Sequence, residues 1–560
     1  MVRWFAGPGP QGPPGRLLPR WLFLRAIGVI YFSAFFSLVF QIRGLIGPEG
    51  LLPANMYLKV VARDLGGLRY WYAPTLLWLS TGNHALMTLC WVGMIASFLL
   101  MTVNIWPRGM LAICWLLFLS FVTAAQDFSG YQSDGMLLSA GLICWFFAPG
   151  GFRPGWGESQ PPSRGSLFLL QIVWFTIYFE SGVVKYFGGD QSWRNFTAMD
   201  QYYQNGPLPT WIGWYVSQLP QHFQAATAVF TIVAELGLVW LAFLPRPFRI
   251  VCFWIVTFLQ VGIILTANYA FLNYLVLALG ILLLDDRYLV KFFPKRWTGR
   301  VRAKLEVSAA PDQNEAIVDL SVSGENVPPA ESPLTPRTEV LSDKGKEIWI
   351  AQVRQFASAA YIWIAAIVLA WLLYANADIV LDRVLGAAPL PGQPIALLEP
   401  FRVANPYGLF GRMTWRRYEI EFQGSDDGIH WTTYPFRFKP QDPAKAPGIY
   451  APYQPRFEWN LWFASLGTWQ DNTWVVRVEQ LLLTNDKYVV ALFASHPFPN
   501  QPPKQIRAVL WQYWFTNLAE KRATGMWWRR EYLGLYAPSL ELGPDGKFMV
   551  TGFPGTYPEP

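Results

Sequence analysis

Long apolar segments constrain this 560-residue chain more than any other feature of its sequence. A helix needs about 20 mostly apolar residues to cross the hydrocarbon of a bilayer, and its backbone groups are then satisfied within the helix. Such segments lie near residues 21–40, 84–104, 109–126, 134–149, 166–187, 223–244, 249–267, 270–284 and 353–374. The sequence therefore predicts a multi-pass α-helical membrane bundle of about nine spans, of which 134–149 and 270–284 are short.

Composition and charge agree with a membrane protein. Charged residues make up only 14% of the chain and aromatic residues 17%, including 29 Trp. Soluble domains carry about 25% charged residues, and Trp collects at membrane–water interfaces. The net charge of +7 comes from Arg and Lys clusters that lie beside apolar segments, as they do at cytoplasmic helix ends. We therefore expect membrane lipids as partners and no binding of nucleic acid.

The distribution of Arg and Lys predicts the orientation of the chain. Every second connection carries basic residues, whereas the short connections at 127–133 and 268–269 carry none. By the positive-inside rule, the N-terminus is then cytoplasmic, and an odd number of spans places the C-terminal part on the lumenal or extracytoplasmic side. The predicted domains are a polytopic membrane domain with eight of the spans (1–300), a flexible cytoplasmic linker (301–346), a ninth transmembrane helix (347–377) and an exoplasmic β-rich domain (378–560).

The C-terminal part shows strand and turn patterns. RRYEIEFQ (416–423) alternates apolar with charged residues, GSDDG (424–428) is a turn sequence, and IHWTTYPFRF continues as a second strand, so the three predict a β-hairpin. IRAVLWQYWF (506–515) predicts a strand buried on both faces, and WVVRVEQLLL (474–483) has helical spacing. We expect a soluble β-rich, sandwich-like domain with helical insertions.

Two ionisable residues lie at the end of the fifth apolar segment. Within FESGVVKYF, Glu180 and Lys185 occupy positions where charged side chains are costly and face a protein interior, a cavity or the interface. Their spacing puts them about 140° apart on a helix, which is poor geometry for a direct ion pair. Lys185 either snorkels to the interface or supplies a chemical group. We expect Glu180 and Lys185 to close a packed helix end that leads into the long aromatic loop 188–220.

Several distinctive stretches occur in both halves of the chain. They are RYWYAPTLLW (69–78), SGVVKYFGGDQSWRNFTAMDQYY (181–203), NPYGLFGRMTWRRYEIEFQGSDDGIHW (405–431), APYQPRFEWNLWFASL (451–466), HPFPNQPPKQIRAVLWQYWFT (496–516) and GMWWRREYLGLYAPSL (525–540). Together and in this order they resemble the lipase maturation factor family. The resemblance implies a multi-pass membrane protein that helps secreted homodimeric lipases to fold, assemble and become active, with its C-terminal domain in the lumen. The membrane would be that of the endoplasmic reticulum in a eukaryote and the cytoplasmic membrane in a bacterium.

We also expect a set of residues to bind a client protein or a ligand, where the clients would be exported or lumenal proteins such as lipases. The candidates are Trp193, Arg194, Asp200, Asn405, Tyr407, Arg417, Asp427, Arg456, Trp459 and Trp462. Two positions depart from the family pattern. QYYQNGP (201–207) stands where the family's loop reads close to Tyr-His-Tyr-Glu-Thr-Gln-Pro, and Glu458 stands where Asp is usual.

Two alternatives stay open at the level of sequence. The segment from Ser181 to Trp193 is similar to the membrane domain of vitamin K-dependent gamma-carboxylase, where a lysine acts as base, so Lys185, with Glu180 nearby, is the candidate catalytic residue of a membrane enzyme. The β-rich domain could instead bind lipid headgroups or glycans through its loops. The main prediction remains a maturation factor that is not an enzyme.

The sequence offers no pattern for a metal or a cofactor, and we predict neither. The four His residues are scattered without HxxxH or HExxH spacing, and the four Cys residues lie within apolar segments. GxSxG is missing, so the chain is not itself a recognisable α/β-hydrolase lipase.

Overall fold

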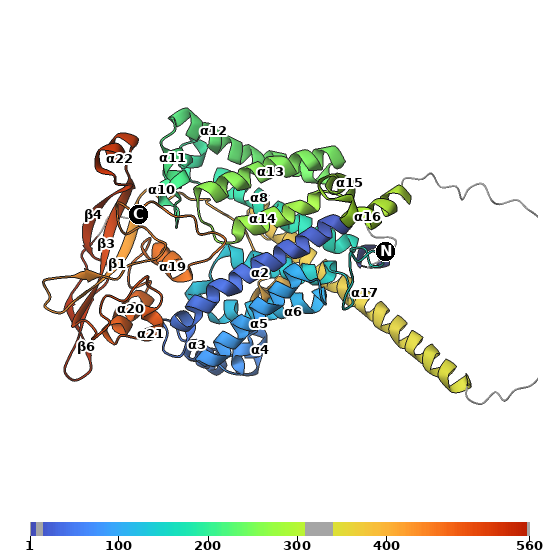
Figure 1. Ribbon diagram of the computed structural model, residues 1–560, viewed down its shortest axis with the longest axis horizontal. Coiled ribbons are helices and arrows are strands. Elements are labelled where there is room, and N and C mark those ends of the chain that lie inside the picture. Colours follow the sequence, from blue (N-terminus) through green and yellow to red (C-terminus); the bar gives the residue numbers. More distant parts are fainter. Residues whose placement is uncertain (1, 7–14, 308–339, 557–560) are drawn as a thin grey trace, which may run out of the picture.

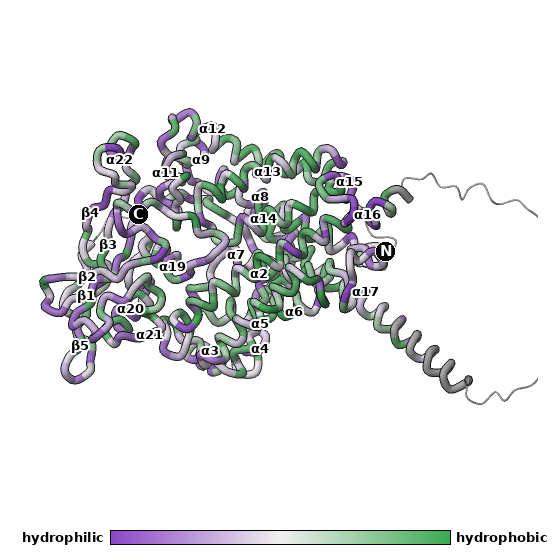
Figure 2. Tube along the Cα trace, viewed as in Figure 1, coloured by the Kyte–Doolittle hydropathy of each residue, from purple (hydrophilic) through white to green (hydrophobic). Residues whose placement is uncertain are grey.

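The computed structural model describes residues 2–6, 15–307 and 340–556 (Figure 1). A bundle of long helices makes up its larger part, and a sheet with several short helices lies against one end of the bundle. Apolar residues fill the middle of the bundle, whereas polar residues are frequent in the sheet domain and at the opposite end of the bundle (Figure 2). A helix bundle in a bilayer requires this distribution, because its middle meets hydrocarbon and its ends meet water.

In the part of the chain that the structure describes, seven helices are long and apolar enough to cross a membrane. They are α2 (Leu17–Ile46), α5 (Asn83–Thr102), α6 (Pro107–Ala124), α8 (Arg164–Phe187), the continuous segment of α12 (Gln221–Ile232), η4 (Val233–Gly237) and η5 (Leu238–Phe243), α13 (Arg246–Thr266) and α17 (Val340–Leu385). Each coincides with a predicted apolar segment. The chain is therefore an integral multi-pass membrane protein by the length and composition of its helices.

The other two predicted spans form shorter helices, so the count of nine is not confirmed. They are α7 (Gln132–Phe147) and α14 (Leu272–Gly280), which η6 (Ile281–Leu283) continues. Both begin with buried polar residues, Asp134 in α7 and Asn273 in α14, which leaves less apolar length than the sequence pattern indicated. Most of their residues are buried among the neighbouring helices, so they form the inside of the bundle.

Contacts between the connections show which helix ends lie together. At the end near the N-terminus, Arg16 Nη1 donates to the carbonyl of Leu282 (2.9 Å), and Arg108 Nε donates to the carbonyl of Ala148 (2.9 Å). The beginnings of α7 and α14 lie at the opposite end, where they meet the sheet domain. The two short helices therefore run between the same two ends as their long neighbours.

Short helices complete both parts of the fold. On the membrane domain they are α1 (Val2–Ala6), α3 (Ala54–Leu65), α4 (Arg69–Tyr72), α9 (Gln191–Arg194), α10 (Ala198–Asn205), α11 (Trp211–Ser217), α15 (Asp286–Leu289) and α16 (Lys295–Val307). Another, α18 (Gln393–Ala396), lies against α17. On the sheet domain they are α19 (Arg456–Ala464), α20 (Trp474–Leu483), α21 (Lys487–Val490) and α22 (Leu518–Thr524).

The described strands form one six-stranded sheet. They are β1 (Arg417–Ser425), β2 (Thr432–Thr433), β3 (Gln505–Phe515), β4 (Trp528–Leu535), β5 (Ser539–Leu542) and β6 (Phe548–Gly552). The order is β2-β1-β3-β5-β6, with β4 also paired to β3, and every pairing is antiparallel. The predicted hairpin is confirmed as β1–β2, and the helical segment 474–483 is confirmed as α20.

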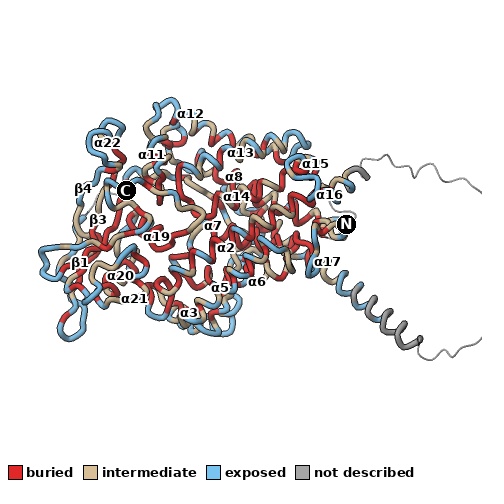
Figure 3. Tube along the Cα trace, viewed as in Figure 1, coloured by how far each residue is buried: buried red, intermediate tan, exposed pale blue. Residues whose placement is uncertain are grey.

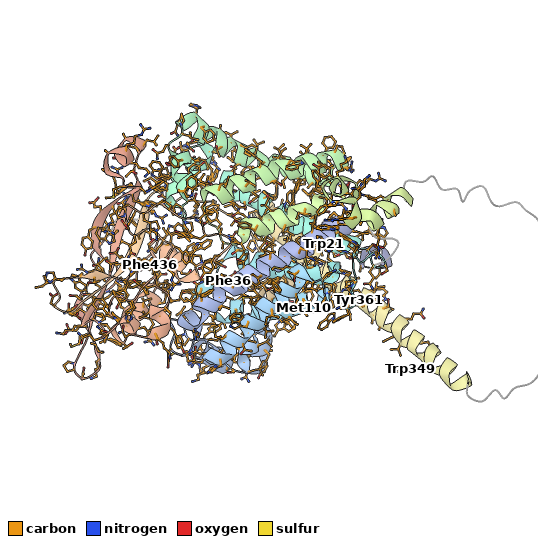
Figure 4. The ribbon with its side chains drawn as sticks, in the orientation of Figure 1. Trp21, Phe36, Met110, Trp349, Tyr361 and Phe436 are labelled. Atoms are coloured by element: carbon orange, nitrogen blue, oxygen red, sulfur yellow. The ribbon has the colours of Figure 1, made fainter. Side chains whose placement is uncertain are left out.

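The expected sandwich is not confirmed, because helices take the place of a second sheet. Residues of α19 and α20 pack on β1, β3 and β5. The rings of Phe422, Phe436, Phe457 and Phe493 meet in this layer, and Figure 4 labels Phe436 inside the sheet domain. A sheet face covered by helices shows the same alternation of apolar residues as a face covered by another sheet, so the pattern could not separate the two.

The boundaries of the predicted linker fall on helices. Residues 301–307 belong to α16 and residues 340–346 to α17, while 308–339 lie outside the described residues. The predicted ninth span (347–377) lies within α17, whose apolar part runs from Gln355 to Leu385 and extends past residue 378, the predicted start of the sheet domain.

Candidate functional site

The sheet domain is attached to the bundle through buried polar contacts, and we call this region the junction. It is formed by the ends of α2, α7, α8 and α14, by the loop 188–210, and by the segments 402–417 and 447–460 of the sheet domain. Figure 3 shows buried residues both in the bundle and in the part of the sheet domain that faces it. A buried polar group is costly unless it is paired, so these contacts determine how the two parts fit.

The end of α8 holds the loop 405–411. Glu180 is 1% exposed, and its Oε2 accepts a hydrogen bond from the backbone N–H of Tyr407 (2.7 Å). Trp193 donates from its indole N–H to the carbonyl of Phe410 (2.8 Å). A Cβ at Gly411 would come within 2.1 Å of the Val184 side chain, so the close approach of this loop to α8 requires glycine.

Lys185 pairs with a residue of another helix. Its Nζ lies 2.7 Å and 2.8 Å from the two carboxylate oxygens of Glu235, which belongs to the π-helical turn η4, and 5.3 Å from the ring of Trp193. The side chain is buried, so the snorkelling interpretation is wrong, whereas the predicted lack of a direct Glu180–Lys185 pair agrees with this geometry. Both oxygens of one carboxylate therefore hold the ammonium of Lys185 in a buried ion pair.

Arg456 of α19 forms the second buried ion pair of this region. Its guanidinium bonds both oxygens of Asp134 at 2.7 and 2.8 Å and donates to the carbonyl of Phe128 (2.7 Å). The same guanidinium lies 5.4 Å from the ring of Tyr131. The ring of Trp459 lies 5.5 Å from that tyrosine, so α19 is fixed to the start of α7 by charge and by aromatic contact.

Arg417 attaches β1 to the loop between α8 and α12. It is fully buried and donates to the carbonyls of Gln204 (2.8 Å), Gly206 and Pro207 (3.1 Å). It also bonds Glu419, which in turn pairs with Lys439 at 2.8 Å. The predicted alternation of β1 is therefore present, but its charged face is as deeply buried as its apolar face.

Two buried amides complete the junction. Asn268, at the start of the α14 segment, donates to the carbonyl of Gly448 (2.9 Å) and accepts from the N–H groups of Tyr450 (2.7 Å) and Ala451 (3.0 Å). Gln41, near the end of α2, donates to the carbonyl of Gln454 (2.9 Å). These contacts extend the attachment across the width of the bundle.

Glu458, at the position where the family resemblance led us to expect Asp, has a local structural role. Its carboxylate accepts hydrogen bonds from three consecutive backbone N–H groups, those of Arg437 (3.0 Å), Phe438 (2.8 Å) and Lys439 (2.7 Å). Burial raises the pKa of Glu458, and the three N–H groups oppose that rise. The side chain thus orders the segment that carries Lys439.

The remaining predicted residues are spread over the molecule. Asn405 lies in the junction, where its Nδ2 donates to the carbonyl of Arg402 (2.8 Å). Arg194 is exposed and donates to the carbonyl of Tyr186, and Asp200 is exposed and accepts from Gln221.

Asp427 and Trp462 are not part of the junction contacts. Asp427 accepts from the ring of His430 in the exposed β1–β2 turn (2.7 Å), which lowers the pKa of its carboxyl, and Trp462 is buried in α19 beside Phe463.

Sequence reasoning missed the partners of these residues. Asp134, Asn268 and Gln41 each sit at the boundary of an apolar segment, and this position was their only signal. Glu235 was recognisable as the main ionisable group in mid-span, but nothing in the sequence connects it with Lys185. Among residues 2–6, 15–307 and 340–556, no group of three or more His, Cys, Asp or Glu side chains could hold a metal ion.

The fold and the junction define a class: an integral multi-pass membrane protein with a sheet domain docked on one end of its helix bundle. A family model described as the lipase maturation factor transmembrane domain matches residues 18–291, and one described as the lipase maturation factor C-terminal domain matches residues 403–538. The chain belongs to the lipase maturation factor family.

Individual relatives are similar over nearly the whole chain. Lipase maturation factor 2 of Gallus gallus is 31% identical over 95% of this chain and 82% of its own length. Lipase maturation factor 1 of Bos taurus is 30% identical over 99% of this chain and 97% of its own length. No solved structure matches. The members of this family are maturation factors rather than enzymes, in agreement with the prediction that this chain is not an enzyme.

Proposed function

We propose that this protein assists the folding, assembly or activation of exported proteins, lipases among them, and that its sheet domain does so outside the cytoplasm. The observation that carries the proposal is the similarity of both domains, in the same order, to proteins named lipase maturation factors. The buried junction supports a joint role of the two domains, because it holds the sheet domain in one position relative to the bundle.

The proposal includes an orientation. The N-terminal end of the bundle carries a concentration of basic residues, including Arg296, Arg300 and Arg302 of α16, and the sheet domain lies at the other end. The positive-inside rule favours a cytoplasmic location for the basic end. The sheet domain would then face the lumen of the endoplasmic reticulum in a eukaryotic cell, or the outside of the cytoplasmic membrane in a bacterial cell.

The experiment is deletion of the gene in its native host, with the amount and specific activity of exported lipase measured separately. We expect the specific activity to fall while the amount of lipase messenger RNA stays constant, and we expect the full chain to restore it. Unchanged lipase activity, together with unchanged yields of all exported proteins, would contradict the proposal. A reporter fused after Pro560 tests the orientation independently, since cytoplasmic activity of that reporter would refute it.

A further inference from the structure

The sheet has one free edge that lacks the usual protection against pairing. Strand β6 ends the order β2-β1-β3-β5-β6, and none of the described strands pairs with its outer edge. Unpaired edges attract other strands, so proteins shorten them or place charges on them. The edge strand β2 has only two residues, and β4, which also has a free side, carries Arg529, Arg530 and Glu531. Within its own five residues, FMVTG, β6 carries neither kind of protection.

The first three residues of β6 are apolar, and their side chains are exposed on both faces of the strand. Phe548 is 37% exposed, Met549 46% and Val550 47%, and Phe553 just beyond the strand is 73% exposed. The β5–β6 hairpin lies at the side of the sheet domain away from the helix bundle (Figure 1). Contact with lipid therefore does not account for these side chains.

The backbone of β6 points donors and acceptors outward at defined residues. The N–H of Gly543 bonds the carbonyl of Lys547 (2.8 Å) at the hairpin turn. Hydrogen-bonded and non-hydrogen-bonded pairs alternate along an antiparallel ladder, so the next pair, Leu542–Phe548, is non-hydrogen-bonded. The pair that contains Val550 is non-hydrogen-bonded for the same reason. The N–H and C=O groups of Phe548 and Val550 are therefore directed to the free edge.

We propose that β6 binds an extended, apolar segment of an incompletely folded exported protein, which adds to the sheet as a further antiparallel or parallel strand. This inference rests on the proposed function and names the surface that such a client would use. Only another strand offers donors and acceptors at the spacing of Phe548 and Val550. The residues directly after β6 are a poor substitute, because Pro554 has no N–H to donate. The hairpin also lies beyond residue 538, where the match to the family's C-terminal domain ends.

The test compares two substitutions at one residue in the full-length protein. Val550→Pro removes the outward N–H of β6 and leaves the bonds to β5 intact, which edge strands tolerate. Val550→Thr keeps the β-branched shape and the N–H. The probe is reduced and carboxymethylated ribonuclease A, an exported protein held unfolded, and binding is measured by fluorescence anisotropy with the full chain in nanodiscs.

We expect V550T to bind within about twofold of the unsubstituted protein and V550P to bind about tenfold more weakly. Amide hydrogen exchange should slow at Phe548 and Val550 when the probe is added to the unsubstituted protein. Unchanged exchange at the junction in V550P will show that this variant is folded.

Three results would overturn the proposal: no binding to the unsubstituted protein, equal binding to V550P, or protection confined to other strands. A dimer that dissociates in V550P would overturn it as well, since the edge would then serve a second copy. If the V550P gene fully restores lipase activity in the deletion strain, the edge proposal fails and the proposed function stands. If deletion itself has no effect, the proposed function fails.

Discussion

Removal of Asp134 should open the junction without unfolding the bundle. In an Asp134→Ala variant, the guanidinium of Arg456 stays buried at 2% exposure and keeps only the carbonyl of Phe128 and the ring of Tyr131 as close partners. Breaking a buried ion pair by deleting one partner costs about 3–5 kcal/mol, because the other charge is left unpaired. That free energy corresponds to a rise of roughly a hundredfold to several thousandfold in the population of the opened junction.

The assay is amide hydrogen exchange on the full chain in nanodiscs, followed by mass spectrometry. Peptides that cover 126–134 and 456–464 should exchange faster by the same large factor, while peptides from α13, which lies away from the pair, should be unchanged. The control is the double variant Asp134→Leu/Arg456→Met, in which neither charge remains and much of the protection should return.

A change of less than about threefold in both peptides would refute the reasoning, since the pair would then contribute under 1 kcal/mol. The reasoning would also be refuted if the two peptides exchanged as fast in the double variant as in Asp134→Ala. In that case the loss would come from the shape of the aspartate and not from the charge of Arg456.

Three further changes test other contacts. Lys185→Met should lower the free energy of unfolding of the bundle by about 3–5 kcal/mol in a denaturant titration, because it leaves Glu235 unpaired. The double variant Lys185→Met/Glu235→Leu should recover most of that loss, and equal stability of all three proteins would contradict this prediction. Arg417→Lys should lower the free energy of unfolding by about 1–3 kcal/mol, because an ammonium cannot reach three carbonyls as the guanidinium does. An unchanged free energy in the same titration would show that those hydrogen bonds contribute little. Glu479, whose carboxylate accepts from the N–H of Ala508 (2.6 Å), is fully buried, and this burial raises the pKa of Glu479 well above its usual range. Folding thus favours its protonated form, so stability is lost as pH rises from the unfolded pKa towards the folded one. Glu479→Gln should therefore raise the melting temperature at pH 8 and leave it unchanged near pH 4; a gain that is the same at both values would rule out titration of this group.

The elements of the fold were largely predictable from local pattern. The length of an apolar segment determines whether it can cross a bilayer, and this property is read directly from the residues. The β1–β2 hairpin and α20 were predictable because turn residues and periodicity are local. The partner of a sheet face is not local, and for that reason a helix-covered sheet was expected to be a sandwich.

The junction could not be predicted, because the contacts that join the bundle to the sheet domain connect residues that are far apart in the chain. Asp134 and Arg456 are separated by 322 positions, and Glu180 and Tyr407 by 227. The sequence around Arg417 indicated the wrong environment for its side chain. Its place on the charged side of an alternating strand indicated exposure, whereas the carbonyls that bury it belong to a loop 210 to 213 positions earlier.

The carbonyl partners of Arg417 impose an order on biosynthesis. The loop that carries Gln204 and Pro207 is made well before the strand that needs it leaves the ribosome. A fragment that starts at residue 378 would lack the loop carbonyls that bind Arg417 and the Asp134 carboxylate that binds Arg456, so the segments 402–417 and 447–460 should be less ordered when it is produced alone. The sheet domain therefore completes its attachment only after the membrane domain that receives Arg417 and Arg456 has been made.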